Sequence, residues 1–148
     1  MNLASRAVLA ALASLVAAGC ALKPRTAITS RAPAIVRGAF VDDYGQLYTI
    51  DDSMWQQGQA ARYHVVRWDA TGKFAIAQND PANPTDGNRW TRIDWIELPQ
   101  QAPYTWGYCY TAYQAASAAA ALAAPPVGRE TPRTGCNGFP FTRMRAIP

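Results

Sequence analysis

The sequence predicts a small all-β domain: an antiparallel meander of about six strands, curled into a barrel or folded as a sandwich, with one short alanine-rich helix near the C-terminus. Three observations favour this fold class. Short runs of aromatic and β-branched residues begin at residue 38, turn-forming residues separate them regularly, and no helical periodicity intervenes before residue 110. Closing such a sheet covers most of its exposed edges.

The expected strands follow from these runs. Residues 40–41 and 47–50 flank a turn at 42–45 (DDYG), which is typical of a hairpin. A second turn at 69–72 (DATG) joins the next two runs. The segments that we expect to be strands are residues 40–41, 47–50, 63–68, 74–78, 89–98 and 104–110.

Residues 111–124 are expected to form the helix, because nine of these 14 residues are alanine, the residue with the highest helix propensity. Pro125 and Pro126 end this run. A helix with so few large side chains is marginal alone, so we expect it to pack across the sheet or one barrel end. Residues 125–148 are expected to be an irregular tail, pinned through Cys136.

Length and composition indicate one folded domain, which we place at residues 38–148. A chain of 148 residues has no room for two ordinary cores, and 11% aromatic residues exclude a disordered chain. The formal net charge is +4, but basic residues concentrate towards both ends. Residues 38–128 hold nine acidic and five basic side chains. Nucleic acid is therefore not an expected partner.

The N-terminal segment has the features of an export signal. Arg6 precedes an apolar run at residues 7–19, which is short for a membrane span and typical of a signal peptide. Residues 15–20 (LVAAGC) resemble a bacterial lipobox. This resemblance implies a lipoprotein signal peptide at 1–19, a fatty-acylated Cys20 and membrane anchorage at the cell envelope, and Ala21 favours the outer membrane over the inner. Ordinary signal cleavage and an uncleaved anchor are the alternatives.

Residues 20–37 are expected to be a flexible tether between the lipid and the domain. They contain four basic residues, no acidic residue and two prolines, without a sustained period.

The cysteine count is consistent with this organisation. Three cysteines are an odd number for an exported protein. If Cys20 carries lipid, Cys109 and Cys136 remain to pair in an oxidising compartment, and closing their loop would contribute about 3–4 kcal/mol. Two free thiols are the alternative, and a zinc site is disfavoured because one distant histidine does not complete a ligand set.

The sequence offers little that resembles a catalytic constellation. Its single histidine, His64, lies within an expected strand, and neither Ser53 nor Ser117 lies in a nucleophile-elbow motif. We therefore expect no catalytic residue and no cofactor. The alternative is a glycan-directed envelope hydrolase that uses Asp94 and His64 beside an aromatic cleft.

The most polar segment, residues 79–88, carries five Asx side chains, and calcium takes oxygen ligands of this kind. The spacing is not that of an EF-hand, and no glutamate closes the loop. Because a long hairpin loop requires the same residue types, turn formation is the preferred interpretation and a calcium site the alternative. The five residues are Asn79, Asp80, Asn83, Asp86 and Asn88.

Aromatic residues are the strongest remaining signal. Alternate residues of a strand project from one face, and four aromatics alternate along residues 104–110. If that face is open, its rings would stack against a sugar or another planar ligand; if it is closed, they form the core, which is the preferred interpretation. The four residues are Tyr104, Trp106, Tyr108 and Tyr110.

Several segments resemble a family of uncharacterised, small, exported or lipid-anchored bacterial β domains. The resemblance rests on GAFVDDYG (38–45), IDDSMW (50–55), AIAQND (75–80), WTRIDW (90–95), WGYCY (106–110) and TGCNGF (134–139), in this order. It implies an exported β domain with a disulfide and no particular activity. We therefore expect a non-enzymatic lipoprotein that binds a glycan or an envelope protein.

Overall fold

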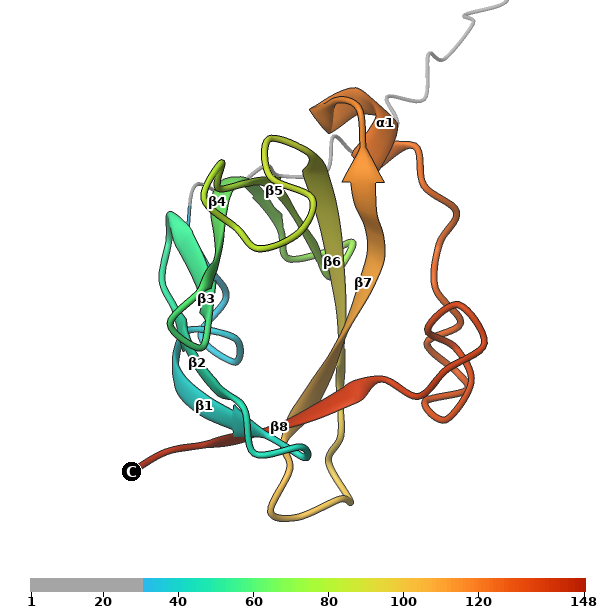
Figure 1. Ribbon diagram of the computed structural model, residues 1–148. Coiled ribbons are helices and arrows are strands. Elements are labelled where there is room, and N and C mark those ends of the chain that lie inside the picture. Colours follow the sequence, from blue (N-terminus) through green and yellow to red (C-terminus); the bar gives the residue numbers. More distant parts are fainter. Residues whose placement is uncertain (1–30) are drawn as a thin grey trace, which may run out of the picture.

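The computed structural model describes residues 31–148, in which eight strands form a closed antiparallel barrel (Figure 1). The prediction of an all-β, barrel-like meander with a short helix near the C-terminus is confirmed, with eight strands instead of six. The lipidation site expected at Cys20 lies outside the described residues. The strands are β1 Gly38–Asp42, β2 Leu47–Ile50, β3 Met54–Gln57, β4 Ala61–Asp69, β5 Phe74–Asn79, β6 Trp90–Glu97, β7 Trp106–Ala115 and β8 Thr142–Ala146.

The barrel closes because β8 pairs with two strands at once. Each strand from β1 to β7 pairs with the next one in sequence, and β8 bonds to both β7 and β1. Met144 is opposite Trp106 on one side and opposite Asp42 on the other. Closure of this kind removes the free sheet edges on which other chains could pair.

The sequence prediction missed strands β3 and β8. Both are short, and neither has more than two apolar residues in succession. In β8 only Met144 is buried, and its neighbours Arg143 and Arg145 are exposed on the opposite face. The tail predicted to be irregular therefore contains the strand that closes the barrel.

The helix predicted at 111–124 is wrong over its first half. Strand β7 continues to Ala115, opposite Trp90 of β6, and the helix α1 covers only Ala118–Leu122. It begins at Ser117, whose side chain accepts a hydrogen bond from the backbone N–H of Ala120 at 3.1 Å. Backbone pairing with β6 outweighs the helix propensity of alanine here. Within residues 31–148, no helix has the length and apolar character required to cross a membrane.

Alternate strand residues fill the barrel with aromatic rings. Four tryptophans are at most 2% exposed and stand edge-on to neighbouring rings, as Trp55 does to Trp106 at a centroid distance of 5.9 Å. Trp106 and Tyr108 of the predicted aromatic stripe belong to this core, at 0% and 4% exposure. For these two residues the core interpretation is correct. The buried tryptophans are Trp55, Trp68, Trp95 and Trp106.

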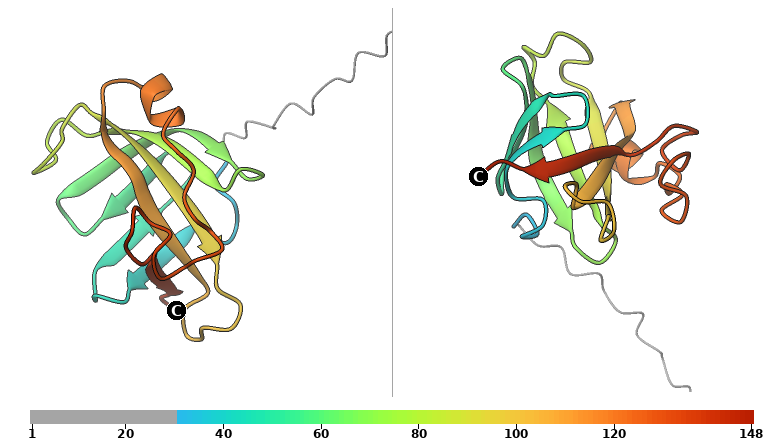
Figure 2. Two further views of the ribbon diagram at one scale, coloured as in Figure 1. Left: turned by 90° about the vertical axis from the view of Figure 1, so that its right-hand side faces the viewer. Right: turned by 90° about the horizontal axis from the view of Figure 1, so that it is seen from below.

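The described part of the predicted tether, residues 31–37, packs against one barrel end. Ala32 and Val36 are buried in the main core and Ile35 packs against it. The backbone N–H of Ala32 donates to Asp52 in the β2–β3 turn at 2.9 Å. We call this segment the plug. In the left view of Figure 2 the plug lies on the right-hand side, whereas the β3–β4 turn and the β5–β6 loop lie on the left.

Residues 123–141, which we call the strap, cross the outer wall of the barrel from α1 to β8 (Figure 1). The predicted disulfide between Cys109 of β7 and Cys136 of the strap is confirmed. Phe141 of the strap packs with Ile96, Leu98 and Cys109 in a small second core.

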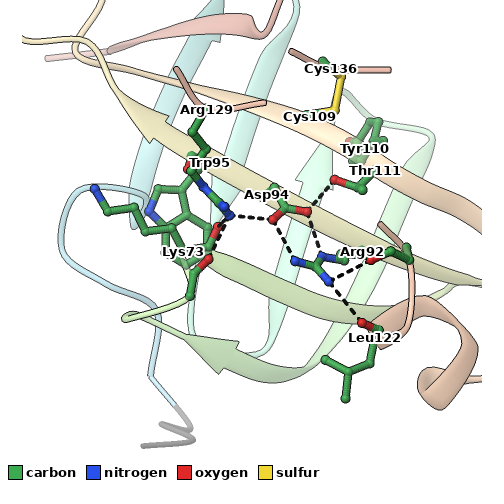
Figure 3. A network of polar contacts seen from close by, with 12 residues as sticks. Lys73, Arg92, Asp94, Trp95, Cys109, Tyr110, Thr111, Leu122, Arg129 and Cys136 are labelled. Carbon is green, nitrogen blue, oxygen red and sulfur yellow. Dashed lines mark hydrogen bonds and ion pairs between the residues drawn. A yellow bond between two sulfur atoms is a disulfide. The ribbon is translucent and has the colours of Figure 1, made fainter. Parts of the chain in front are cut away.

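A buried carboxylate also fastens the strap and α1 to the barrel (Figure 3). Asp94 of β6 is 0% exposed and accepts hydrogen bonds from Arg92 at 2.8 and 3.1 Å, from Arg129 of the strap at 2.6 Å and from the Thr111 hydroxyl. Arg92 then donates to the carbonyl of Leu122 at the end of α1, at 3.0 Å. A buried charge requires hydrogen-bond and ion-pair partners of this kind.

Candidate ligand-binding site

A cleft lies at the barrel end opposite the plug, between the β3–β4 turn and the β5–β6 loop. We call it the mouth cleft, and its volume is about 340 Å³, within the range usual for small-molecule sites. None of its lining side chains is charged. The lining residues are Gln46, Gln57, Gly58, Gln59, Ala60, Ala61, Tyr63, Asn83, Pro84 and Thr85.

The aromatic surface of the mouth cleft comes from Tyr63. This residue is half-buried on β4, packs against the main core, and lies against Tyr110 of β7 with ring centroids 5.3 Å apart. The Tyr110 hydroxyl donates to Oε1 of Gln57 at 3.1 Å. Within residues 31–148 the amide nitrogen of Gln57 has no such partner, so both its N–H groups are available to a ligand.

The tyrosines at this end carry neutral hydroxyls. Burial raises the pKa of Tyr63 above its ordinary value and the pKa of Tyr110 well above it. Deeper in the barrel, Tyr108 and Tyr48 share a hydrogen bond of 2.7 Å, and Tyr48 donates to Asp42 at 2.9 Å. Burial raises the pKa of Tyr108 to about 12. The mouth cleft and the interior below it therefore hold polar but uncharged rings at neutral pH.

Internal hydrogen bonds hold the β5–β6 loop in place at the cleft. The Asn83 side chain accepts from the backbone N–H of Arg62 and donates to the Arg62 carbonyl, both at 2.8 Å. Asp80 accepts a hydrogen bond from the Ala82 N–H, and its Oδ2 lies 2.7 Å from His64 Nε2. The Ala82 hydrogen bond and then the His64 contact lower the pKa of Asp80. This wall of the cleft is therefore fixed before any ligand arrives.

The calcium alternative is not favoured by these contacts, because the Asx side chains are bonded to different partners within the loop and strands. Asn79 is buried, donates to two carbonyls, and accepts from the Thr91 hydroxyl at 2.6 Å. Asp86 accepts from Gln114 at 2.9 Å, and both Asp86 and Asn88 have positive φ, as turn residues do. Residues 31–148 contain no cluster of three His, Cys, Asp or Glu side chains suited to a metal ion.

The predicted aromatic stripe is divided among three environments. Trp106 and Tyr108 are core residues, Tyr110 lies behind Tyr63 at the mouth, and Tyr104 lies before β7, where its ring contacts Arg143 at 4.6 Å. The four residues therefore do not form one open binding face. Across the barrel, Tyr110 of β7 lies against Tyr63 of β4 and donates to Gln57 of β3.

The sequence interpretation missed Tyr63 and the glutamines of the mouth. The segment QQGQ at 56–59 combines amide side chains with a turn glycine, Gly58, at φ 59°. This amide-rich hairpin turn is the signal that would have indicated a polar site.

The two side chains of the hydrolase alternative do not meet. His64 is exposed on β4 and paired with Asp80, whereas Asp94 is buried under the strap. His64 of β4 pairs with Gln78 of β5, and Gln78 pairs with Trp90 of β6. Asp94 lies four residues after Trp90 on β6. Two strand spacings and four residues separate the pair by about 16 Å along the barrel wall.

Comparison of the chain with protein-family models, with curated proteins and with solved structures gives no match. The resemblance to exported β domains therefore stays a prediction.

Proposed function

We propose that this protein is a non-enzymatic, lipid-anchored binding module of the cell envelope, and that it takes a neutral glycan in the mouth cleft. One observation carries this proposal: an uncharged cleft combines four amide side chains with the ring of Tyr63. The membrane anchor is the predicted lipid on Cys20.

The chemistry of the lining suits a sugar. Each sugar hydroxyl both donates and accepts hydrogen bonds, and an amide side chain offers donors and an acceptor together. The apolar face of a pyranose ring packs on an aromatic ring, which Tyr63 provides with Tyr110 supporting it from behind. A charged ligand would find no counter-ion among the lining residues.

Rigidity also supports binding. Asn83 fixes the β5–β6 loop against β4, and Tyr110 fixes Gln57. A site that is ordered in advance loses less conformational entropy when it binds, so modest contacts give measurable affinity.

The position of the plug fits an anchored module. The chain leads into the barrel at the plug, and the mouth cleft lies at the opposite end. A domain attached through its N-terminus would then direct the cleft away from the bilayer.

Isothermal titration calorimetry tests the proposal with the full chain purified in detergent. The titrants are trimers of N-acetylglucosamine, glucose and galactose. We expect one of them to bind, and expect Gln57→Ala and Gln59→Ala each to weaken binding by about two- to tenfold, the effect of one lost hydrogen bond. Gln101→Ala is the matched control, because Gln101 lies outside the mouth cleft.

No heat with any neutral trimer would overturn the glycan assignment. Equal weakening in Gln59→Ala and Gln101→Ala would overturn the assignment of the mouth cleft as the site.

A further inference from the structure

A second and larger hollow lies between the strap and the barrel, apart from the mouth cleft. We call it the strap groove, and its volume is about 580 Å³. The β1–β2 turn, the β6–β7 turn, the strap and β8 all contribute to its walls. The lining residues are Asp43, Tyr44, Leu98, Gln101, Pro132, Arg133, Pro140, Phe141 and Arg143.

Covalent and hydrogen bonds hold the strap side of this groove. The Cys109–Cys136 disulfide joins the strap to β7, and the Phe141 N–H donates to the Pro132 carbonyl at 2.9 Å. At Gly135 the strap folds back so closely that an added Cβ would lie 1.8 Å from the Gly128 carbonyl oxygen. The groove is therefore a built feature with a fixed shape.

The charges of the strap groove favour an anionic occupant. Arg143 is held by Asp43 at 2.9 Å and by the Tyr104 ring, which lies 4.6 Å from its guanidinium carbon. Arg133 is exposed and has no hydrogen-bond or ion-pair partner anywhere in residues 31–148. Asp43 is the only acidic side chain among the lining residues and is already paired, so the positive charge of Arg133 is uncompensated.

Apart from Gln101, the remaining lining side chains are aromatic or apolar. Tyr44 is 80% exposed, and the rings of Pro132 and Pro140 line the hollow with it. An arginine fork binds a carboxylate through two parallel hydrogen bonds, and tyrosine and proline rings pack against an extended backbone. We infer that the strap groove docks an extended acidic peptide segment of another envelope protein, with a carboxylate on Arg133 and the backbone against Tyr44.

Fluorescence anisotropy tests this inference on the full chain in detergent, with a fluorescein-labelled peptide of four Glu-Pro repeats. We expect saturable binding that weakens about tenfold in Arg133→Ala, the effect of losing a charge-assisted pair, and that also weakens in Tyr44→Ala. Arg89→Ala is the matched control, because Arg89 is also exposed and lies outside the groove. The corresponding Lys-Pro peptide is expected not to bind.

Three results would overturn the inference. The first is that the Glu-Pro peptide does not bind. The second is that Arg133→Ala and Arg89→Ala weaken peptide binding equally, which would indicate attraction to net charge alone. The third is Arg133-dependent binding to phosphatidylglycerol vesicles that the peptide does not displace, which would assign the groove to a lipid surface.

Discussion

The buried carboxylate of Asp94 gives the sharpest stability prediction. Asp94→Asn keeps the shape of the side chain but removes the charge that neutralises Arg92, whose side chain is only 10% exposed. Breaking a buried ion pair by removing one partner costs about 3–5 kcal/mol. Arg129 is 27% exposed and the asparagine oxygen still accepts a hydrogen bond, so we expect the lower end, about 3 kcal/mol.

Urea denaturation of the full chain in detergent, followed by near-ultraviolet circular dichroism of the buried tryptophans, measures this loss. Thermal unfolding followed by the same signal should show a fall in Tm of about 12 °C for a domain of this size. Asp43→Asn is the matched control, because its partner Arg143 is 44% exposed and the pair contributes at most about 1 kcal/mol.

The double variant Arg92→Leu with Asp94→Leu should lose less than the sum of its single variants, because Arg92 is then not left buried without its partner. Arg129, which is 27% exposed, loses the same carboxylate in Asp94→Leu alone and in the double variant. A loss in Asp94→Asn no larger than in Asp43→Asn would refute the role of Asp94 in fastening the strap.

Three further predictions concern the disulfide, the tyrosines and the lipid. Serine at both Cys109 and Cys136 should lower the free energy of unfolding in urea by about 3–4 kcal/mol, and an unchanged midpoint would contradict the bridge. Burial raises the pKa of Tyr108 to about 12 and the pKa of Tyr48 further. The free energy of unfolding should therefore fall as the pH rises above about 10, where tyrosine ionises in the unfolded chain. Tyrosinate absorbance that appears at the ordinary pKa without unfolding would contradict this. Mass spectrometry of protein from native membranes should find an acylated Cys20 as the first residue, and an intact unmodified N-terminus would contradict the anchor.

Much of the fold could be predicted because strand runs and turns are local signals. The turns DDYG at 42–45 and DATG at 69–72 lie where hairpins form, and alternation along Tyr63–Trp68 identifies β4. The number of cysteines predicts the disulfide between Cys109 and Cys136, and this prediction is confirmed.

The wrong or missing strand and helix predictions concern segments whose structure depends on strands far away in the sequence. Residues 111–115 adjoin an alanine-rich run but form a strand, because β6 supplies backbone hydrogen bonds that no local pattern records. Strand β8 has one buried side chain, Met144, and is a strand only because β1 and β7 lie on either side of it.

The candidate site was predictable only in part. The stripe ending at Tyr110 and the loop containing Asn83 are both identified in the sequence. It does not show that Tyr110 packs on Tyr63 or that Asn83 bonds to Arg62, both of them on β4. Tyr63 supplies the ring of the mouth cleft, yet in sequence it is one more aromatic residue of a strand. A site formed by separate hairpins has no contiguous motif.

Mapping a bound sugar tests the central claim most directly. The measurement is the amide spectrum of ¹⁵N-labelled full chain in detergent, titrated with the neutral trimer that binds in calorimetry. We predict saturable shift changes confined to the amides of residues 46, 57–61, 63, 83 and 85, which line the mouth cleft. Changes confined to residues 132–143 of the strap groove, or no change at all, would contradict the account.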